Sequence, residues 1–171
     1  MQTDEYLKLA EVEDQMWYFR ALHAHAADAL RLGMAGAPAG GILDAGCGTG
    51  GFIKRVMADF HDRPFTGIDF SALACDLARR RCLARIEEAS ITALPFADGE
   101  FSAVVSLDVL VQVHEHEQAL AEFFRVLKPG GVAVINVAAY KWLWSYHDEA
   151  CQSRHRFTRA KLAGQLRAAG F

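Results

Sequence analysis

An acidic residue lies directly before a glycine-rich turn, in the stretch Ile42-Leu43-Asp44-Ala45-Gly46-Cys47-Gly48-Thr49-Gly50-Gly51. Glycine adopts positive φ and lets the backbone come close to a ligand. Glycine turns between a strand and a helix usually bind phosphate, which the Asp44 carboxylate would repel. The acid therefore favours a ligand that carries positive charge, such as an amino group or a sulfonium.

Two other interpretations of this turn stay open on the segment alone. Gly46, Gly48 and Gly51 also fit the pattern G-x-G-x-x-G, the fingerprint of dinucleotide-binding folds. A structural turn that binds no ligand is the second alternative. The other motifs along the chain are needed to separate these interpretations.

A second acidic residue, Asp69, ends the next apolar run of the chain. A carboxylate at the end of a second strand can accept hydrogen bonds from both hydroxyls of a ribose. The alternative is that Asp69 interacts favourably with the dipole of the following helix, for which Ser71 is the predicted N-cap. Asp69 is therefore a candidate ribose ligand.

The elements that must position these acids alternate between apolar runs and helical periodicity, which predicts a parallel sheet with helices on both faces. Residues 3–33 are predicted to be helical in two pieces, and residues 33–41, which contain four glycines and Pro38, to be a linker. Strands are predicted at 41–45, 65–69, 86–89, 101–107 and 132–138, and helices at 52–60, from Ser71 to about Ala84, at 117–127 and at 158–169.

Further motifs follow the two acids in a fixed order. They are Gly67-Ile68-Asp69-Phe70-Ser71, Leu94-Pro95-Phe96-Ala97-Asp98-Gly99-Glu100-Phe101, Val109-Leu110 and Arg125-Val126-Leu127-Lys128-Pro129-Gly130-Gly131. Over residues 42–138 this succession resembles the class I S-adenosylmethionine-dependent methyltransferases of the small-molecule type, often called type 11. Nicotinamide enzymes share the first two signals but not the Leu-Pro-Phe segment or the Leu-Lys-Pro-Gly-Gly turn.

The resemblance implies an α/β fold, a Rossmann-like three-layer sandwich with a mostly parallel sheet. Five strands are present and the family's usual last two strands are missing, because the chain stops at Gly170-Phe171. We expect an N-terminal helical lid and linker at 1–40 and a methyltransferase core, truncated at its C-terminus, at 41–171. The uncovered edge of such a sheet favours pairing with another chain, and hence a homo-oligomer.

The resemblance also implies a function and a set of site residues. The donor is S-adenosylmethionine, the product S-adenosylhomocysteine, and the acceptor a small molecule or a glycan or lipid intermediate. Two positions depart from the family: Ser90 stands where an Asp commonly holds the adenine, and Gln112 where many relatives carry a His. The implied donor-binding residues are Trp17, Arg20, Asp44, Gly46, Cys47, Gly48, Gly50, Asp69, Phe70, Ser90, Ile91 and Leu107.

Several of these residues have a second interpretation. Ile91 either lines the adenine or packs in the core, and Trp17 and Arg20 either cover the donor or pack against the sheet. A base is needed only if the acceptor must lose a proton, and His114 is the candidate, although an exposed loop histidine is the alternative. Asp108 either contacts the donor amino group or the acceptor, or is a solvated turn acid.

One further segment follows the last strand. Residues 142–156 combine aromatic and cationic side chains that would lie at the edge of the sheet where open α/β folds bind ligands. They either face an acceptor or form a surface loop.

Bulk properties restrict the alternatives. A net charge of −3 gives no general reason to bind nucleic acid. Four cysteines without a Cys-x-x-Cys pair make a metal site improbable and indicate a reducing, cytoplasmic setting. No apolar run approaches the ~20 residues of a membrane span. A donor-binding module without catalysis and a nicotinamide-dependent oxidoreductase remain as rival functions.

Overall fold

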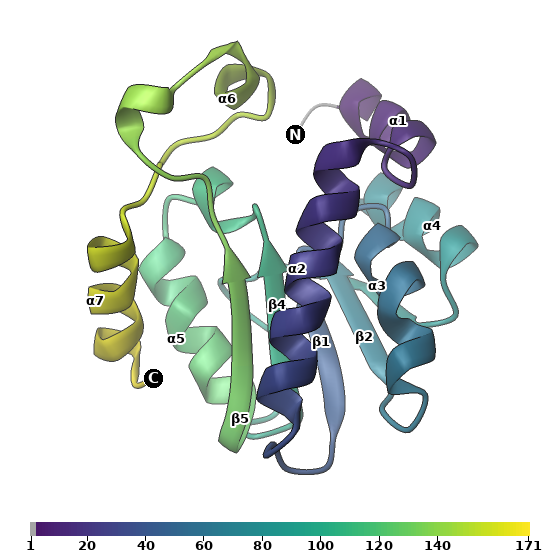
Figure 1. The fold of residues 1–171 in the computed structure, drawn as a ribbon, viewed down its shortest axis with the longest axis vertical. Coiled ribbons are helices and arrows are strands. Elements are labelled where there is room, and N and C mark those ends of the chain that lie inside the picture. The colour runs from purple at the N-terminus through teal and green to yellow at the C-terminus, as the bar shows by residue number, and fades with distance from the viewer. Residues whose placement is uncertain (1–2) are drawn as a thin grey trace.

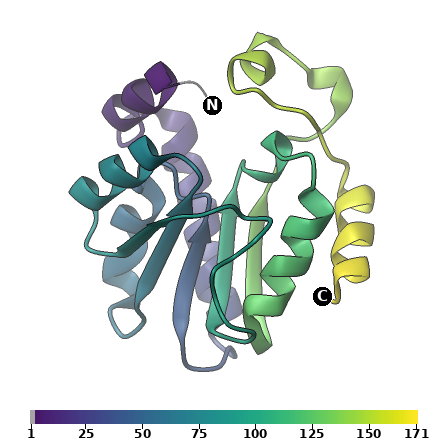
Figure 2. The same ribbon diagram turned by 180° about the vertical axis from the view of Figure 1, so that it is seen from behind.

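The computed structural model describes residues 3–171 and shows a five-stranded sheet with helices on both faces (Figures 1 and 2). The strand order is β3-β2-β1-β4-β5, and every pair of neighbours is parallel. The fold is therefore the predicted Rossmann-like α/β arrangement. The strands are β1 (Gly41–Ala45), β2 (Phe65–Asp69), β3 (Arg85–Glu88), β4 (Phe101–Leu107) and β5 (Leu127–Asn136).

The helices divide between the two faces of the sheet because successive strand residues point to opposite sides. Ile42 packs with the helices of one face and its neighbour Leu43 with those of the other, and both are fully buried. On the first face lie α2 (Trp17–Met34), α3 (Gly51–Val56) and α4 (Ala72–Arg81), and on the second α5 (His116–Val126) and α7 (Arg159–Ala169).

The N-terminal segment is divided between a short and a long helix. The long helix, α2, packs against β4 and β5 and contributes Leu30 and Met34 to the hydrophobic core. The short helix, α1 (Thr3–Val12), lies near α4 and the sheet edge where the strands end (Figure 1). The expected boundary at residue 40 therefore does not separate two hydrophobic cores.

Several element ends differ from their predictions, and α3 (Gly51–Val56) continues as the 3₁₀ turn η1 (Met57–Phe60). The helix expected to reach about Ala84 ends at Arg81, where Cys82 takes an extended conformation. The last strand begins at Leu127 instead of residue 132. Leu127 pairs with Phe101 and Val132 with Ala103, so the Pro-Gly turn between them bulges out of the strand and does not precede it.

The sheet has a topological switch between β1 and β4. After β1 the chain builds β2 and β3 on one side, and it then crosses to build β4 and β5 on the other. Open α/β sheets bind ligands outside the carboxyl ends of the strands at such a point. The side chains that follow Ala45 and Leu107 therefore flank the expected binding position.

The segment after β5 passes above this edge before the chain returns as α7 (Figure 1). It contains the 3₁₀ turn η3 (Lys141–Leu143) and the short helix α6 (Tyr146–Ala150). Asp148, which is 2 % exposed, accepts two hydrogen bonds from the Arg156 guanidinium, each 2.8 Å long.

No helix within residues 3–171 is long and apolar enough to cross a bilayer.

Candidate functional site

The glycine-rich turn joins the end of β1 to α3. Gly46, Gly48 and Gly50 all have positive φ. A Cβ on Gly46 would lie 2.3 Å from Cγ2 of Val109, so packing against the end of β4 requires glycine there. A Cβ on Gly48 would meet only Leu9, at 3.9 Å. Gly48 therefore leaves its backbone open on one side, as a ligand-binding turn needs.

Asp69 connects three elements at the end of β2. Its carboxylate accepts hydrogen bonds from the backbone N–H groups of Gly48 and Ser71, both at 3.0 Å, and from the Tyr6 hydroxyl at 3.3 Å. Ser71 caps α4 as predicted by accepting from the N–H of Ala74. Asp69 is thus fixed beside the glycine turn by backbone donors, and its burial raises its pKa despite these hydrogen bonds.

Acidic groups dominate the electrostatics of the turn. Burial, together with the negative charges of Glu13 and Asp69, raises the pKa of Asp44 to about 8. Glu13 lies against the first turn of α3, because a Cβ on Gly51 would be 2.1 Å from its Cδ. Dinucleotide folds place a pyrophosphate at that helix start. Here the Glu13 carboxylate lies beside that helix start and is paired with Arg81.

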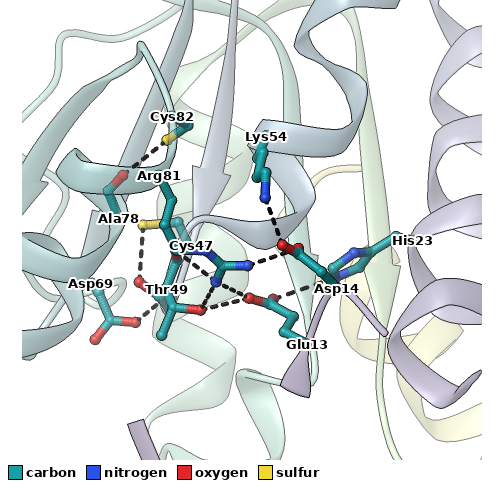
Figure 3. Close-up of polar contacts among 11 residues, drawn as sticks. Glu13, Asp14, His23, Cys47, Thr49, Lys54, Asp69, Ala78, Arg81 and Cys82 are labelled. Carbon is teal, nitrogen blue, oxygen red and sulfur yellow. Dashed lines mark hydrogen bonds and ion pairs between the residues drawn. The ribbon is translucent and has the colours of Figure 1, made fainter. Parts of the chain in front are cut away.

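Glu13 also belongs to a buried polar cluster that attaches the α1–α2 connection to the turn (Figure 3). Its carboxylate accepts hydrogen bonds from the Thr49 hydroxyl and the Arg81 guanidinium, both at 2.5 Å. Arg81 also donates to Asp14, which pairs in turn with Lys54. The segment that follows α1 is therefore attached to α3 and α4.

His23 lies on the other side of Glu13, with Nε2 at 3.7 Å from the carboxylate (Figure 3). Burial, together with the neighbouring Arg55 charge, lowers the pKa of His23 to about 4. The imidazole is therefore neutral near pH 7. Arg81 consequently provides the positive charge that compensates Glu13 at this position.

The predicted donor residues differ in their exposure. Cys47 is buried, and burial raises the pKa of its thiol. The thiol therefore stays protonated and unreactive. Ile91 is 6 % exposed within the core of the α5 face. Ser90 is exposed and bonds the Thr92 hydroxyl at 2.8 Å. Phe70, next to Asp69, is 63 % exposed.

Four further predicted residues lie in other elements, two of them at the start of α2. Trp17 is 75 % exposed and Arg20 is also exposed, so neither packs against the sheet. Leu107, at the end of β4, is half-buried beside the switch point. Gly50 packs against Ala78 of α4 and N-caps α3 with a left-handed conformation. Of these four residues, Gly50 and Leu107 adjoin the glycine turn or the switch point.

His114 lies in a group of histidines. Its ring is 6.2 Å from that of His155, and its carbonyl oxygen is 3.1 Å from Nδ1 of His116. His114 itself is exposed, and burial lowers the pKa of His155. Among residues 3–171 no group of three or more His, Cys, Asp or Glu side chains is arranged to hold a metal ion.

Sequence reasoning missed the partners of the strand-end acids. Tyr6 reaches Asp69 from α1, and Tyr18 of α2 donates a 2.6 Å hydrogen bond to Asp108. Asn136, at the end of β5, donates to the same carboxylate at 2.6 Å. These contacts join residues far apart in the chain, and no local sequence pattern predicts them. An acid directly after a predicted strand was the available signal for Asp108.

Comparison with known proteins places the chain in a family. A family model described as "Methyltransferase domain" matches residues 43–135, more than half of the chain. The chain belongs to this methyltransferase-domain family of type 11. It is 34 % identical over 152 residues to the malonyl-[acyl-carrier protein] O-methyltransferase of Enterobacter lignolyticus, covering 85 % of this chain and 60 % of that protein.

Solved structures show the same fold. An S-adenosylmethionine-dependent methyltransferase from Thermotoga maritima, a possible histamine N-methyltransferase, superposes with a TM-score of 0.73 at 22 % identity, covering 98 % of this chain and 76 % of that one. The [4+2]-cyclase SpnF gives 0.71 at 29 % identity, with coverages of 88 % and 56 %. The chain spans only 20–60 % of the length of the curated relatives compared.

Proposed function

We propose that this chain binds S-adenosylmethionine at the glycine turn and transfers its methyl group to a small-molecule, glycan or lipid-type acceptor. The observation that carries the proposal is the buried carboxyl of Asp44, whose pKa of about 8 reflects burial beside Glu13 and Asp69. A ligand with positive charge favours the ionised form of Asp44, whereas a phosphate disfavours it. S-adenosylmethionine carries a sulfonium and an ammonium group.

We propose one orientation of the donor along the carboxyl edge of the sheet, with its adenine toward β3 and its methionine end toward β4. Asp69, at the end of β2, is the ribose ligand, and the open backbone at Gly48 admits close approach. Tyr6 shares an oxygen of Asp69, so ribose binding requires its hydroxyl to share or yield that position. Ser90 and Ile91 are proposed at the adenine and the carbonyl of Leu107 toward the methionine end, with Cys47 and Gly50 shaping the turn.

Other predicted residues lie farther out. Phe70 is exposed beside Asp69, and Trp17 and Arg20 are exposed at the start of α2. We propose that these side chains cover the donor after it binds. Their exposure supports such a role, because no core packing has to be broken before they contact a ligand.

Methyl transfer requires that the acceptor be aligned with the donor methyl group and that water be excluded. The acceptor attacks the methyl carbon in line with the carbon–sulfur bond, whose electron pair remains on sulfur as S-adenosylhomocysteine leaves. An O–H or N–H acceptor must also lose a proton, and His114 remains our candidate base for that step. The free cysteines suit a reducing compartment, so we propose a cytoplasmic location.

Of the two alternative functions, only one has specific support. The [4+2]-cyclase SpnF has this fold, so the fold alone does not dictate methyl transfer. Donor binding without methyl transfer is therefore the second candidate. A nicotinamide-dependent oxidoreductase is disfavoured, because the chain belongs to the methyltransferase-domain family.

Calorimetry with S-adenosylhomocysteine tests donor binding. We expect the wild type to bind it and Asp69→Ala to lose up to two charge-assisted hydrogen bonds of about 1.5–3 kcal/mol each. Asp28→Ala, an exposed acid on α2, is the matched control and should bind normally. An unchanged affinity in Asp69→Ala contradicts the ribose assignment, and thermal stabilisation by NADH but not by S-adenosylhomocysteine contradicts the donor.

Mass spectrometry then separates transfer from binding alone. The protein is incubated with S-adenosylmethionine and cell extract, and products that gain one methyl group are identified. We expect a methylated small molecule, glycan or lipid-type product. Binding of S-adenosylhomocysteine with no product formed by either this chain or a longer form favours the non-catalytic module.

A further inference from the structure

Asp108 has a backbone conformation that few residues adopt. It directly follows β4 and has a φ of +59°, in the left-handed region that non-glycine residues seldom occupy. Such conformations cost free energy and persist where the surrounding contacts hold them, often at functional sites. The backbone N–H of Asp108 donates to the carbonyl of Asn136 at 3.0 Å, which extends the pairing of β4 with β5 by one residue.

The side chain of Asp108 is fixed from two sides. Tyr18, from the first turn of α2, donates to Oδ2 at 2.6 Å, and Asn136 donates through Nδ2 to Oδ1 at 2.6 Å. Burial raises the pKa of Asp108, while these two hydrogen bonds oppose the increase. Burial also raises the pKa of Tyr18, so its hydroxyl stays protonated and donates. Two elements, α2 and β5, therefore hold the carboxylate that follows β4.

The position of Asp108 follows from the topology. β1 lies between β2 and β4, and the switch point is the crevice between β1 and β4. Asp69 stands at the end of β2, on one side of the glycine turn. Val109 touches Gly46 from the other side, so Asp108 directly precedes a residue in contact with the turn. A donor whose ribose is on Asp69 extends across β1 toward Asp108.

We propose that Asp108 faces the sulfonium of the donor and gives the site its preference for charged S-adenosylmethionine over neutral S-adenosylhomocysteine. This inference rests on the proposed function and specifies its charge recognition. A carboxylate near a cation in a poorly hydrated position is attracted far more strongly than in water. When the methyl group leaves, sulfur becomes a neutral thioether and this attraction ends. Asp108 thereby favours donor binding before transfer and product release after it.

The two ligands form a matched pair, because they share the adenosine and the amino-acid group and differ in the methyl group and its charge. Calorimetry compares both ligands on the wild type and on Asp108→Asn. Asparagine tolerates positive φ and can still accept from Tyr18, so the variant keeps its fold. We expect the affinity for S-adenosylmethionine to fall about tenfold and that for S-adenosylhomocysteine less than about twofold.

Two further variants control for indirect effects. Asp98→Asn removes the same charge from an exposed side chain in the loop that precedes β4, at the opposite edge of the sheet, and should leave both affinities unchanged. Tyr18→Phe removes one donor from the carboxylate without removing its charge. We expect it to alter the ratio of the two affinities less than Asp108→Asn does, as a positioning residue should.

Each other outcome overturns the proposal. Equal weakening of both ligands by Asp108→Asn shows that the carboxylate holds the amino-acid group or supports the turn, and unchanged affinities show that it lies outside the site. A change of the ratio in Asp98→Asn shows a general effect of net charge. If the wild type binds neither ligand, the proposed function itself fails, which these other outcomes do not imply.

Discussion

Two glycines of the turn have different physical reasons for being glycine. Both have positive φ, but a Cβ on Gly46 would collide with Val109, whereas a Cβ on Gly48 would meet only Leu9, at 3.9 Å. Gly48→Ala should therefore remain folded, with a strain of about 1–3 kcal/mol, and lose affinity for S-adenosylhomocysteine. Gly46→Ala should lose considerably more stability because its Cβ meets a packed side chain. Urea unfolding and calorimetry on both variants check this, and normal ligand binding by folded Gly48→Ala contradicts it.

The buried carboxyl of Asp44 predicts a dependence of stability on pH. Its pKa of about 8 in the folded protein lies above its ordinary value of 3.8, so the folded state binds more protons between these values. Stability from this group is complete below the ordinary pKa and is lost as the pH rises through about 8. We expect the melting temperature of the wild type to fall from pH 6.5 to 8.5.

Asp44→Asn supplies the control for that measurement. It removes the titration while keeping the size of the side chain, so its melting temperature should depend less on pH across the same interval. The interval lies above the ordinary pKa of histidine, which keeps the opposite contribution of His23, whose pKa is about 4 in the folded protein, largely outside it. Parallel melting curves for the two proteins would count against a buried, protonated Asp44.

At the scale of elements, the attachment of α1 depends on the cluster around Glu13. Its ion pair with Arg81 joins two side chains that are 7 % and 13 % exposed. Removing one partner of a buried pair leaves the other uncompensated and typically costs 3–5 kcal/mol. We expect Glu13→Ala to destabilise the protein by about 3 kcal/mol and to increase hydrogen exchange in α1 more than in β1.

The matched control is the exposed pair between Arg31 and Asp28 on α2. Exposed ion pairs contribute little to stability, so Asp28→Ala should unfold like the wild type. Equal exchange in α1 for Glu13→Ala and the control would show that the cluster does not attach the helix. Because Tyr6 of α1 contacts Asp69, loosening α1 should also change the affinity for S-adenosylhomocysteine.

For the molecule as a whole, the edge of the sheet at β5 predicts self-association. Among residues 3–171 no strand pairs with the outer edge of β5, and its residues 132–136 are half-buried. Unpaired strand edges bind other strands. Light scattering should show a mass that rises above 18.8 kDa with concentration, and β5 amides should gain protection from exchange. A constant mass of one chain at every concentration rules this association out.

The amino-acid sequence by itself determined the order of the elements and the acids that end the strands. Periodicity and glycine placement are local properties, so β1, β2 and β4 were predicted at their observed bounds, with Asp44 and Asp69 at the ends of two of them. The cap at Ser71 was equally local. The start of β5 was not predicted, because sheet pairing across the Pro-Gly bulge decides it. The end of α4 at Arg81 was not predicted either.

Only the tertiary structure decided which side chains meet at that edge. Tyr6 reaches Asp69 across 63 residues, Tyr18 reaches Asp108 across 90, and Arg81 reaches Glu13 across 68. These residues are of ordinary types in ordinary helices, so their local sequence carries no sign of their partners. Packing α1 and α2 over the ends of parallel strands brings them together, and burial there gives the acids the raised pKa values that local sequence does not reveal.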